Sequence, residues 1–220
     1  MIDPAAVAWG GAATGLGTIV LLHGYGSNER ELLNQVLRVL PEFALASLRG
    51  PVTEGPGNGW VSLNRSLTDL DPGAISALAD GVSAGVMAWL DGAQHREPVG
   101  LLGVSQGGVL ALHLLRRAPE RFSFAVNLSG YVLAGRVAGD EILERNHPPV
   151  FWGRGTRDEL VRAADVERTS AWLARHSTAT IRTYDLEHAE SEAEYGDVAA
   201  FVRSVAEGPS QRHLATRPVP

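Results

Sequence analysis

The 220-residue chain contains no cysteine and no lysine. Without cysteine there can be no disulfide, no thiolate nucleophile and no cysteine-ligated metal. All 19 basic residues are arginine, and the formal net charge is −6. Because an acidic surface without a basic stripe does not suit the phosphate backbone, the composition argues against a nucleic-acid partner.

The sequence also lacks a long apolar run. No stretch has eighteen uninterrupted apolar residues, and residues 1–6 contain no basic region. We therefore expect a cytoplasmic protein that does not insert stably into a membrane. A chain of this length folds by default as one domain. We expect the domain to span residues 1–207, and the polar residues 208–220 to form a disordered tail.

Short aliphatic runs alternate with segments of helical periodicity along the whole chain. The predicted strands are 18–22, 43–48, 99–104, 122–128, 149–153 and 180–186, and residues 7–10 fit a short edge strand. The predicted helices are 28–40, 74–90, 106–118, 140–145, 162–176 and 191–206. This alternation predicts an α/β fold with a mostly parallel central sheet and helices on both faces. Ligands of such sheets bind beyond the carboxyl ends of the strands.

A serine flanked by glycines joins one of these strands to a helix. Gly103 and Gly107 lie two residues before and after Ser105, which leaves space for a strained backbone at the serine. Its hydroxyl would be exposed at the carboxyl end of the strand, beside a helix amino terminus that favours developing negative charge. Glycine, serine and glutamine also form ordinary tight turns, so the motif needs partners elsewhere in the chain.

A serine nucleophile needs an imidazole to accept its proton and a carboxylate to orient that imidazole. Of the seven histidines, His188 alone directly follows the last predicted strand. Asp158 follows the preceding strand and a glycine turn, whereas Asp185 lies within a strand and Asp140 in a connection. The sequence thus predicts a catalytic triad of Ser105, Asp158 and His188. The alternative role for Asp158 is to cap the helix that follows it.

The first long strand ends in His23-Gly24-Tyr25-Gly26. An oxyanion formed at Ser105 needs two backbone donors, and the expected ones are the N–H groups of Tyr25 and Gln106. The glycines let the backbone approach the site closely. We interpret His23 as a residue that braces the loop by hydrogen bonding rather than as an acid or base.

Residues 49–72 are rich in proline and glycine and show no regular periodicity. A loop of this length within one domain is usually functional. We expect the side chains of Trp60 and Leu63 to form an apolar wall for the acyl group of the substrate. The alternative for Trp60 is that it packs the loop onto the sheet. Residues 131–148 are too few for a large cap domain, so we expect an open site that hydrolyses short, soluble esters without activation at a lipid interface.

These motifs resemble those of the α/β-hydrolase superfamily and, within it, the phospholipase/carboxylesterase family of small serine esterases, which includes acyl-protein thioesterases. The similar segments, within about residues 18–206, are Leu22–Ser27, Arg49–Pro51 with Trp60, Gly103–Gly108, Gly155–Asp158 with Leu160 and Val161, and Tyr184 with His188. The resemblance implies hydrolysis of carboxylic esters or thioesters by the predicted triad, without metal or cofactor. Trp152 and Arg162 depart from the family pattern, which usually has histidine and proline there, and the first strands are shortened or missing.

Three functions fit these residues. The first is a serine hydrolase that cleaves a small-molecule ester or thioester through an acyl-enzyme on Ser105. The second is a ligand-binding or receptor protein with the same fold and little turnover. A haloperoxidase-like or acyltransferase activity would use the same residues. The sequence leaves the acyl length and the oligomeric state open.

Overall fold

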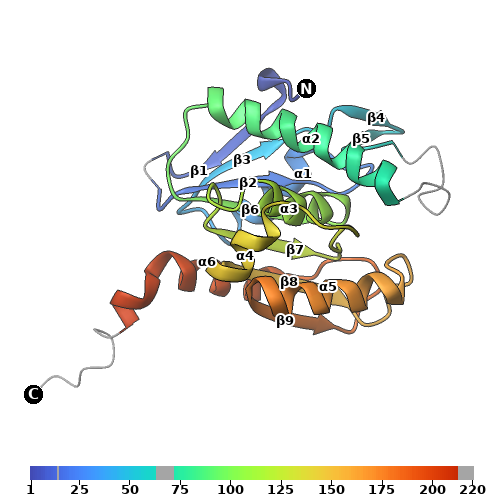
Figure 1. The fold of residues 1–220 in the computed structure, drawn as a ribbon. Coiled ribbons are helices and arrows are strands. Elements are labelled where there is room, and N and C mark those ends of the chain that lie inside the picture. Colours follow the sequence, from blue (N-terminus) through green and yellow to red (C-terminus); the bar gives the residue numbers. More distant parts are fainter. Residues whose placement is uncertain (14, 63–71, 213–220) are drawn as a thin grey trace, which may run out of the picture.

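A seven-stranded sheet forms the centre of the computed structural model, which describes residues 1–13, 15–62 and 72–212 (Figure 1). The strands are β1 (Ala8–Gly11), β2 (Thr18–Leu22), β3 (Ala44–Leu48), β6 (Val99–Val104), β7 (Phe124–Leu128), β8 (Pro149–Gly155) and β9 (Thr178–Tyr184). Their order across the sheet is β1-β3-β2-β6-β7-β8-β9. All neighbours run parallel except β1, which pairs antiparallel with β3.

Helices cover both faces of this sheet (Figure 1). They are α1 (Glu29–Leu37), α2 (Pro72–Gly92), α3 (Gln106–Arg117), α4 (Asp140–Asn146), α5 (Ala163–His176) and α6 (Glu192–Arg212), preceded by the 3-10 turn η1 (Pro4–Ala6). The apolar side chains of α1 and α6 form one core with one face of the sheet. Those of α2, α3, α4 and α5 form a second core on the other face. The predicted fold class is therefore confirmed.

The central strands are buried on both faces, as continuous aliphatic runs require. Every residue of β2, β3, β6 and β7 is buried. The short edge strand expected near residues 7–10 is present as β1 and has alternating burial. A sheet of this kind places the carboxyl ends of its parallel strands at one end of the molecule, where the predicted site residues lie.

Several predicted elements have slightly different bounds in the structure, and three differences change how the chain is organised. The aperiodic loop 49–72 contains a hairpin of β4 (Val52–Glu54) and β5 (Gly57–Gly59), because backbone pairing rather than side-chain periodicity holds these short strands together. Strand β9 both starts and ends two residues before the predicted 180–186. The N–H of Thr178 donates to the carbonyl of Pro148, and Asp185, which was predicted within the strand, directly follows it. Helix α6 continues through a kink at Gly208 to Arg212, into the predicted tail. Residues 213–220 lie outside the described part.

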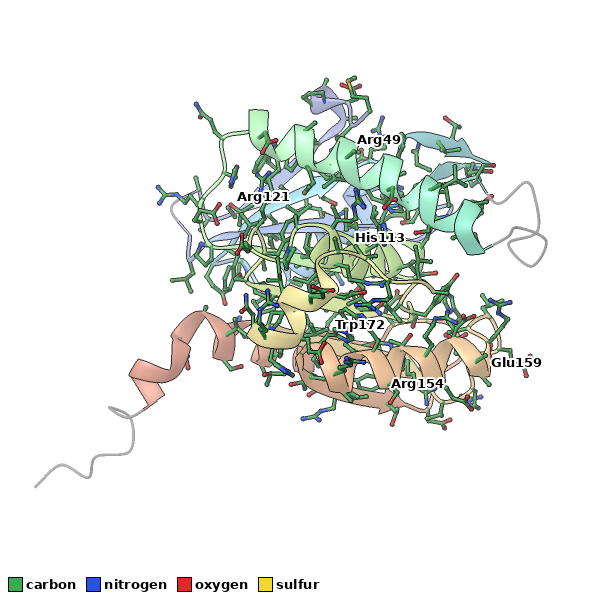
Figure 2. All side chains as sticks on the ribbon, viewed as in Figure 1. Arg49, His113, Arg121, Arg154, Glu159 and Trp172 are labelled. Carbon is green, nitrogen blue, oxygen red and sulfur yellow. The ribbon has the colours of Figure 1, made fainter. Side chains whose placement is uncertain are left out.

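A buried ion pair holds the segment between β7 and α4. The Arg116 guanidinium, at the end of α3, donates to both carboxylate oxygens of Asp140 at 2.8 and 2.7 Å and to the carbonyls of Leu133 and Gly135. Trp172 of α5, labelled in Figure 2, donates its indole N–H to the same carboxylate. Because both charges are paired and hydrogen-bonded, this network fixes residues 133–140 against α3. The connection carries the seven-residue α4, in agreement with the absence of a large cap.

Helix α2 is long and unusually apolar. Among the described residues, Gly73–Gly92 is the one helical stretch that length and composition would allow to cross a bilayer. Its inner side chains Val86, Trp89 and Leu90 are buried in the core against the sheet. The helix thus forms part of the α/β domain, and its amino-terminal half faces the cavity described below.

Candidate active site

Ser105 lies in a sharp turn between β6 and α3. Its backbone angles are φ 51° and ψ −114°, in a region that side-chain-bearing residues rarely adopt. The backbone can make this turn because Gly103 and Gly107, two residues before and after Ser105, have no side chains. A Cβ at Gly103 would lie 2.1 Å from the carbonyl oxygen of Gly107, and one at Gly107 would lie 1.9 Å from that of Leu22. The glycines thus permit the close packing that presents the serine hydroxyl.

The structure brings Ser105, His188 and Asp158 into one hydrogen-bonded chain. The Oγ of Ser105 lies 2.7 Å from Nε2 of His188, and Nδ1 of the same imidazole lies 2.7 Å from Oδ2 of Asp158. An ionised carboxylate can only accept, so Nδ1 carries the proton and Nε2 accepts from the serine hydroxyl. The three residues come from the ends of β6, β8 and β9 and are 83 and 30 residues apart along the chain.

Asp158 lies against the imidazole, but it does not cap the following helix: the N-cap residue of α5 is Arg162, without a side-chain cap, and Asp158 instead caps the turn before it. Its Oδ1 accepts from the backbone N–H groups of Leu160 and Val161 at 2.9 and 3.2 Å, while Oδ2 contacts His188. The carboxylate side chain is only 3% exposed. Turn capping therefore fixes the orientation of the group that contacts the imidazole. In Figure 2, the neighbouring Glu159 marks this end of the molecule.

The two expected oxyanion donors lie beside Ser105. Gln106 is the first residue of α3, and a Cβ built on Gly24, next to Tyr25, would lie 3.7 Å from the Cβ of Ser105. Within the described residues, neither the N–H of Tyr25 nor that of Gln106 donates a hydrogen bond to another group. Both donors are therefore available to an oxygen bound at Ser105.

His23 braces the loop after β2. The backbone N–H of Gly50 donates to its Nε2 at 3.0 Å, which requires that Nδ1 carry the proton donated to the carbonyl of Gly24. Burial lowers the pKa of His23 below its usual value, since charging it would cost solvation. The residue thus links the loop that carries Tyr25 to the start of the β4–β5 segment.

A cavity of about 420 Å³ opens in front of Ser105 and His188. Apart from these residues its lining is mostly apolar. Most of it comes from four parts of the chain: α2 with Ile75, Ala79 and Val82; α3 with Val109 and Leu110; the segment after β7 with Tyr131 and Leu133; and the turn with Leu160 and Val161. Trp60 also lines it, yet only 2% of this residue is exposed, and its indole N–H donates to the carbonyl of His23. Trp60 thus lines the cavity and also packs its loop onto the loop after β2. Leu63 lies outside the described residues.

The side chain of Gln106 fastens the Trp60 loop to the helix that follows Ser105. Its Oε1 accepts from the backbone N–H of Trp60 at 2.6 Å, and its Nε2 donates to the carbonyl of Val61 at 2.9 Å. The sequence had indicated a role for the backbone of Gln106 only. The contact spans 45 residues of chain, so no local pattern could reveal it.

A second, more polar recess of about 300 Å³ lies on the other side of Ser105 and His188. It is bounded by the loop after β2, by α1 and by the start of α6, with Ser27, Glu31, Gln35 and Glu190 among its lining residues. The Ser105 hydroxyl therefore separates an apolar cavity from a polar recess. Among the described residues, no group of three or more histidine or acidic side chains could hold a metal ion.

A buried carboxyl group lies beneath β8, behind the site. Glu194 is 1% exposed, and within the described residues neither of its oxygens has a hydrogen-bond partner. Its Oε1 occupies the space that a Cβ at Gly153 would need. Burial, together with the nearby carboxylates of Glu190 and Asp197, raises the pKa of Glu194 to about 7. The group is therefore protonated in the folded protein at mildly acidic pH.

This raised pKa makes stability depend on pH. An unfolded glutamate ionises near 4.5, so the folded state binds the extra proton between pH 4.5 and 7, and stability falls as pH rises through that window. Glu194→Gln should remove the dependence, and its stabilising effect at pH 8 should exceed that at pH 4.5 by roughly 3 kcal/mol. Chemical denaturation at both pH values measures the difference. The exposed Glu192→Gln on the same helix serves as control, and equal effects of Glu194→Gln at both pH values would contradict the assignment.

Comparisons with known proteins agree with this architecture. The profile of the phospholipase/carboxylesterase family matches residues 9–206. Among solved structures, esterase PE8 is 24% identical with a TM-score of 0.71, over 90% of this chain and 97% of that one. Acyl-protein thioesterase 2 from Zea mays is 21% identical with a TM-score of 0.71, over 91% and 98%.

The carboxylesterase of Bacillus cereus is 19% identical with a TM-score of 0.70, over 90% of this chain and 93% of that one. At these identities the solved structures establish the fold alone. No protein of curated function matches the chain in sequence. The family profile, in contrast, covers almost the whole α/β domain, so the chain belongs to the phospholipase/carboxylesterase family of α/β hydrolases.

Proposed function

We propose that the protein is a serine esterase in which Ser105 is the nucleophile, His188 the general base and acid, and Asp158 the residue that orients and stabilises the imidazole. The observation that carries the proposal is the continuous chain of two 2.7 Å hydrogen bonds from Ser105 through His188 to Asp158. A serine hydroxyl is a weak nucleophile by itself, and this arrangement supplies the base that it needs.

In the first half of the reaction, Oγ of Ser105 attacks the ester carbonyl carbon while Nε2 of His188 takes the hydroxyl proton. The carbonyl oxygen becomes an anion and accepts from the N–H groups of Tyr25 and Gln106. The bond between the carbonyl carbon and the leaving oxygen or sulfur then breaks. His188 returns its proton to the leaving group, and the acyl group remains on Ser105.

In the second half, water takes the place of the leaving group. His188 accepts a proton from the water as it attacks the acyl carbon, and the same oxyanion donors stabilise the second tetrahedral intermediate. The bond to Oγ breaks, Ser105 regains its proton from His188, and the carboxylic acid leaves. Asp158 accepts from Nδ1 throughout and stabilises the imidazolium that forms twice in each cycle.

The apolar cavity and the polar recess suggest where the two parts of an ester substrate bind. The apolar cavity, walled by Trp60, Leu133 and Val82, suits the acyl chain, whose burial there gains hydrophobic free energy. The polar recess with Ser27 and Gln35 suits the leaving group. The ion pair of Arg116 and Asp140 holds Leu133 in the cavity wall, so we expect a pocket of fixed shape rather than a mobile lid.

A series of nitrophenyl esters from acetate to dodecanoate, with matching thioesters, tests the proposal. We expect ordinary saturation kinetics with short and medium acyl groups and an initial burst of nitrophenol equal to the enzyme concentration, if deacylation is the slower step. The rate should not jump when substrate exceeds its solubility. Activation at a lipid interface would contradict the open pocket. No turnover of any ester in the series would contradict the proposed function and favour a binding protein.

A further inference from the structure

The strand β9 forms one edge of the sheet, and its outer side has no strand beside it in the described chain (Figure 1). It is seven residues long, contains no proline, and five of its residues are exposed. The opposite edge strand, β1, has only four residues, two of them glycine. Long open edges invite pairing with another chain unless charges, proline or bulges block them. β9 is therefore the edge of this sheet that is suited to pairing.

The hydrogen bonds at both ends of β9 show which backbone groups point outward. The N–H of Thr178 donates to Pro148 on the β8 side, and the carbonyl of Tyr184 accepts from Thr156 on the same side. Since backbone direction alternates along a strand, Thr180 and Arg182 also point toward β8. The N–H and C=O groups of Ala179, Ile181 and Thr183 must then point to the open edge.

These outward groups match a second copy of the same strand. In an antiparallel pair centred on Ile181, this residue faces its own counterpart, and Ala179 faces Thr183 of the other copy. All three are outward-pointing residues, so each pair can exchange both of its backbone hydrogen bonds. Shifting the register by one residue would break this match.

The side chains also fit this register. Arg182 is the one charged residue of β9, and it would lie opposite Thr180 of the other copy rather than opposite another arginine. Its guanidinium lies 4.0 Å from Asp197 of α6, which balances the charge. The side chain of Ile181, which is 40% exposed, would pack against Ile181 of the other copy. The guanidinium also donates to the Ile181 carbonyl at 3.2 Å, and this exposed bond would be exchanged for a backbone bond.

We propose that two copies of this chain pair through β9 in this antiparallel register and form a sheet that continues across both copies. The two-fold match of backbone groups and the absence of facing like charges favour a second copy over an unrelated strand. The parallel strands of the two copies would then run in opposite directions. Each Ser105 would lie at an opposite end of the combined sheet, so both sites stay open and a monomer remains active.

Single-cysteine variants test the register, because the natural chain contains no cysteine. In the proposed pair, the two copies of residue 181 have Cα atoms about 5.5 Å apart, within the range that a disulfide can bridge. The two copies of residue 183 are offset by four positions, or about 13 Å along the strand. Ile181→Cys should therefore cross-link with an oxidant or a short bis-maleimide, whereas Thr183→Cys and the distant Leu16→Cys should not. Equal cross-linking of all three variants would overturn the register.

Sedimentation velocity over a range of protein concentrations tests the association itself. The wild-type protein should shift from the monomer to twice the monomer mass as concentration rises. Ile181→Lys places two like charges face to face and should raise the midpoint concentration at least about tenfold while ester turnover is retained. Leu16→Lys, at an exposed aliphatic residue away from β9, should behave as wild type. A wild-type protein that stays monomeric, or a dimer that Ile181→Lys does not weaken, would overturn the proposal.

Discussion

Replacing Ser105 with alanine should abolish ester turnover, with a loss of about a millionfold in kcat, or about 8 kcal/mol of transition-state stabilisation. The reason is that the nucleophile and its base act as a unit. Without Oγ, the imidazole of His188 has no hydroxyl to deprotonate and no acyl-enzyme can form. The oxyanion donors and the cavity remain, so only a small residual rate over water is expected. Steady-state kinetics with a short nitrophenyl ester measures the loss.

Two observations separate this chemical loss from a folding defect. The thermal unfolding of Ser105→Ala should match the parent, because among the described residues Oγ makes a hydrogen bond to His188 alone. The parent should also be labelled stoichiometrically at Ser105 by an organophosphonate, and its activity should not respond to a chelator. Activity of the variant within tenfold of the parent, or labelling at another residue, would refute the proposed nucleophile.

Asp158→Asn should reduce kcat by about four orders of magnitude while leaving the fold intact. The amide can still accept from Leu160 and Val161 through its oxygen, but its NH₂ group would then face Nδ1 of His188. An imidazole that accepts at Nδ1 carries its proton on Nε2 and cannot take the proton of Ser105. The variant should therefore bind substrate with little change in KM and fail in the chemical step.

Asp185→Asn is a matched control for this substitution. Asp185 directly follows β9, is exposed, and pairs with Arg157 rather than with the histidine. With Asp140, it was one of the two other aspartates considered as the acid from the sequence. We expect its replacement to leave kcat within about twofold, since exposed ion pairs contribute little. If Asp185→Asn lost activity and Asp158→Asn did not, the assignment of the acid would have to be reversed.

Local sequence patterns were sufficient to predict which residues lie at the carboxyl ends of the strands. Ser105, Asp158 and His188 each follow a strand that the sequence predicts, and parallel strands bring their carboxyl ends together whatever the details of the helices. The bracing role of His23 was also predicted from its place beside the glycines of the loop, and its hydrogen bonds to Gly24 and Gly50 agree with that role. Such inferences rest on topology, and topology follows from the alternation of strands and helices.

Features without a local hydrophobic pattern, and features that depend on contacts between distant segments, could not be predicted. The β4–β5 hairpin has no apolar alternation, and its Gly57–Gly59 strand carries no propensity for strand structure. The amide contacts of Gln106 with Trp60 and Val61 need the folded loop to exist first. The cavity faces of Ile75 and Val82 look like ordinary core positions in the sequence, since burial in a pocket and burial in a core use the same residues.

The packing of Gly103 and Gly107 has a consequence for how such an enzyme can change over generations. A methyl group at either position would collide with backbone atoms rather than with movable side chains, so neighbouring residues cannot compensate. The turn around Ser105 therefore offers selection almost no variation to act on. Much of the lining of the apolar cavity comes from α2, from the segment after β7 and from the turn after Asp158, and none of these three segments contains the glycines of the serine turn. New substrate preferences should thus arise by substitutions in these walls, while the reacting atoms keep their positions.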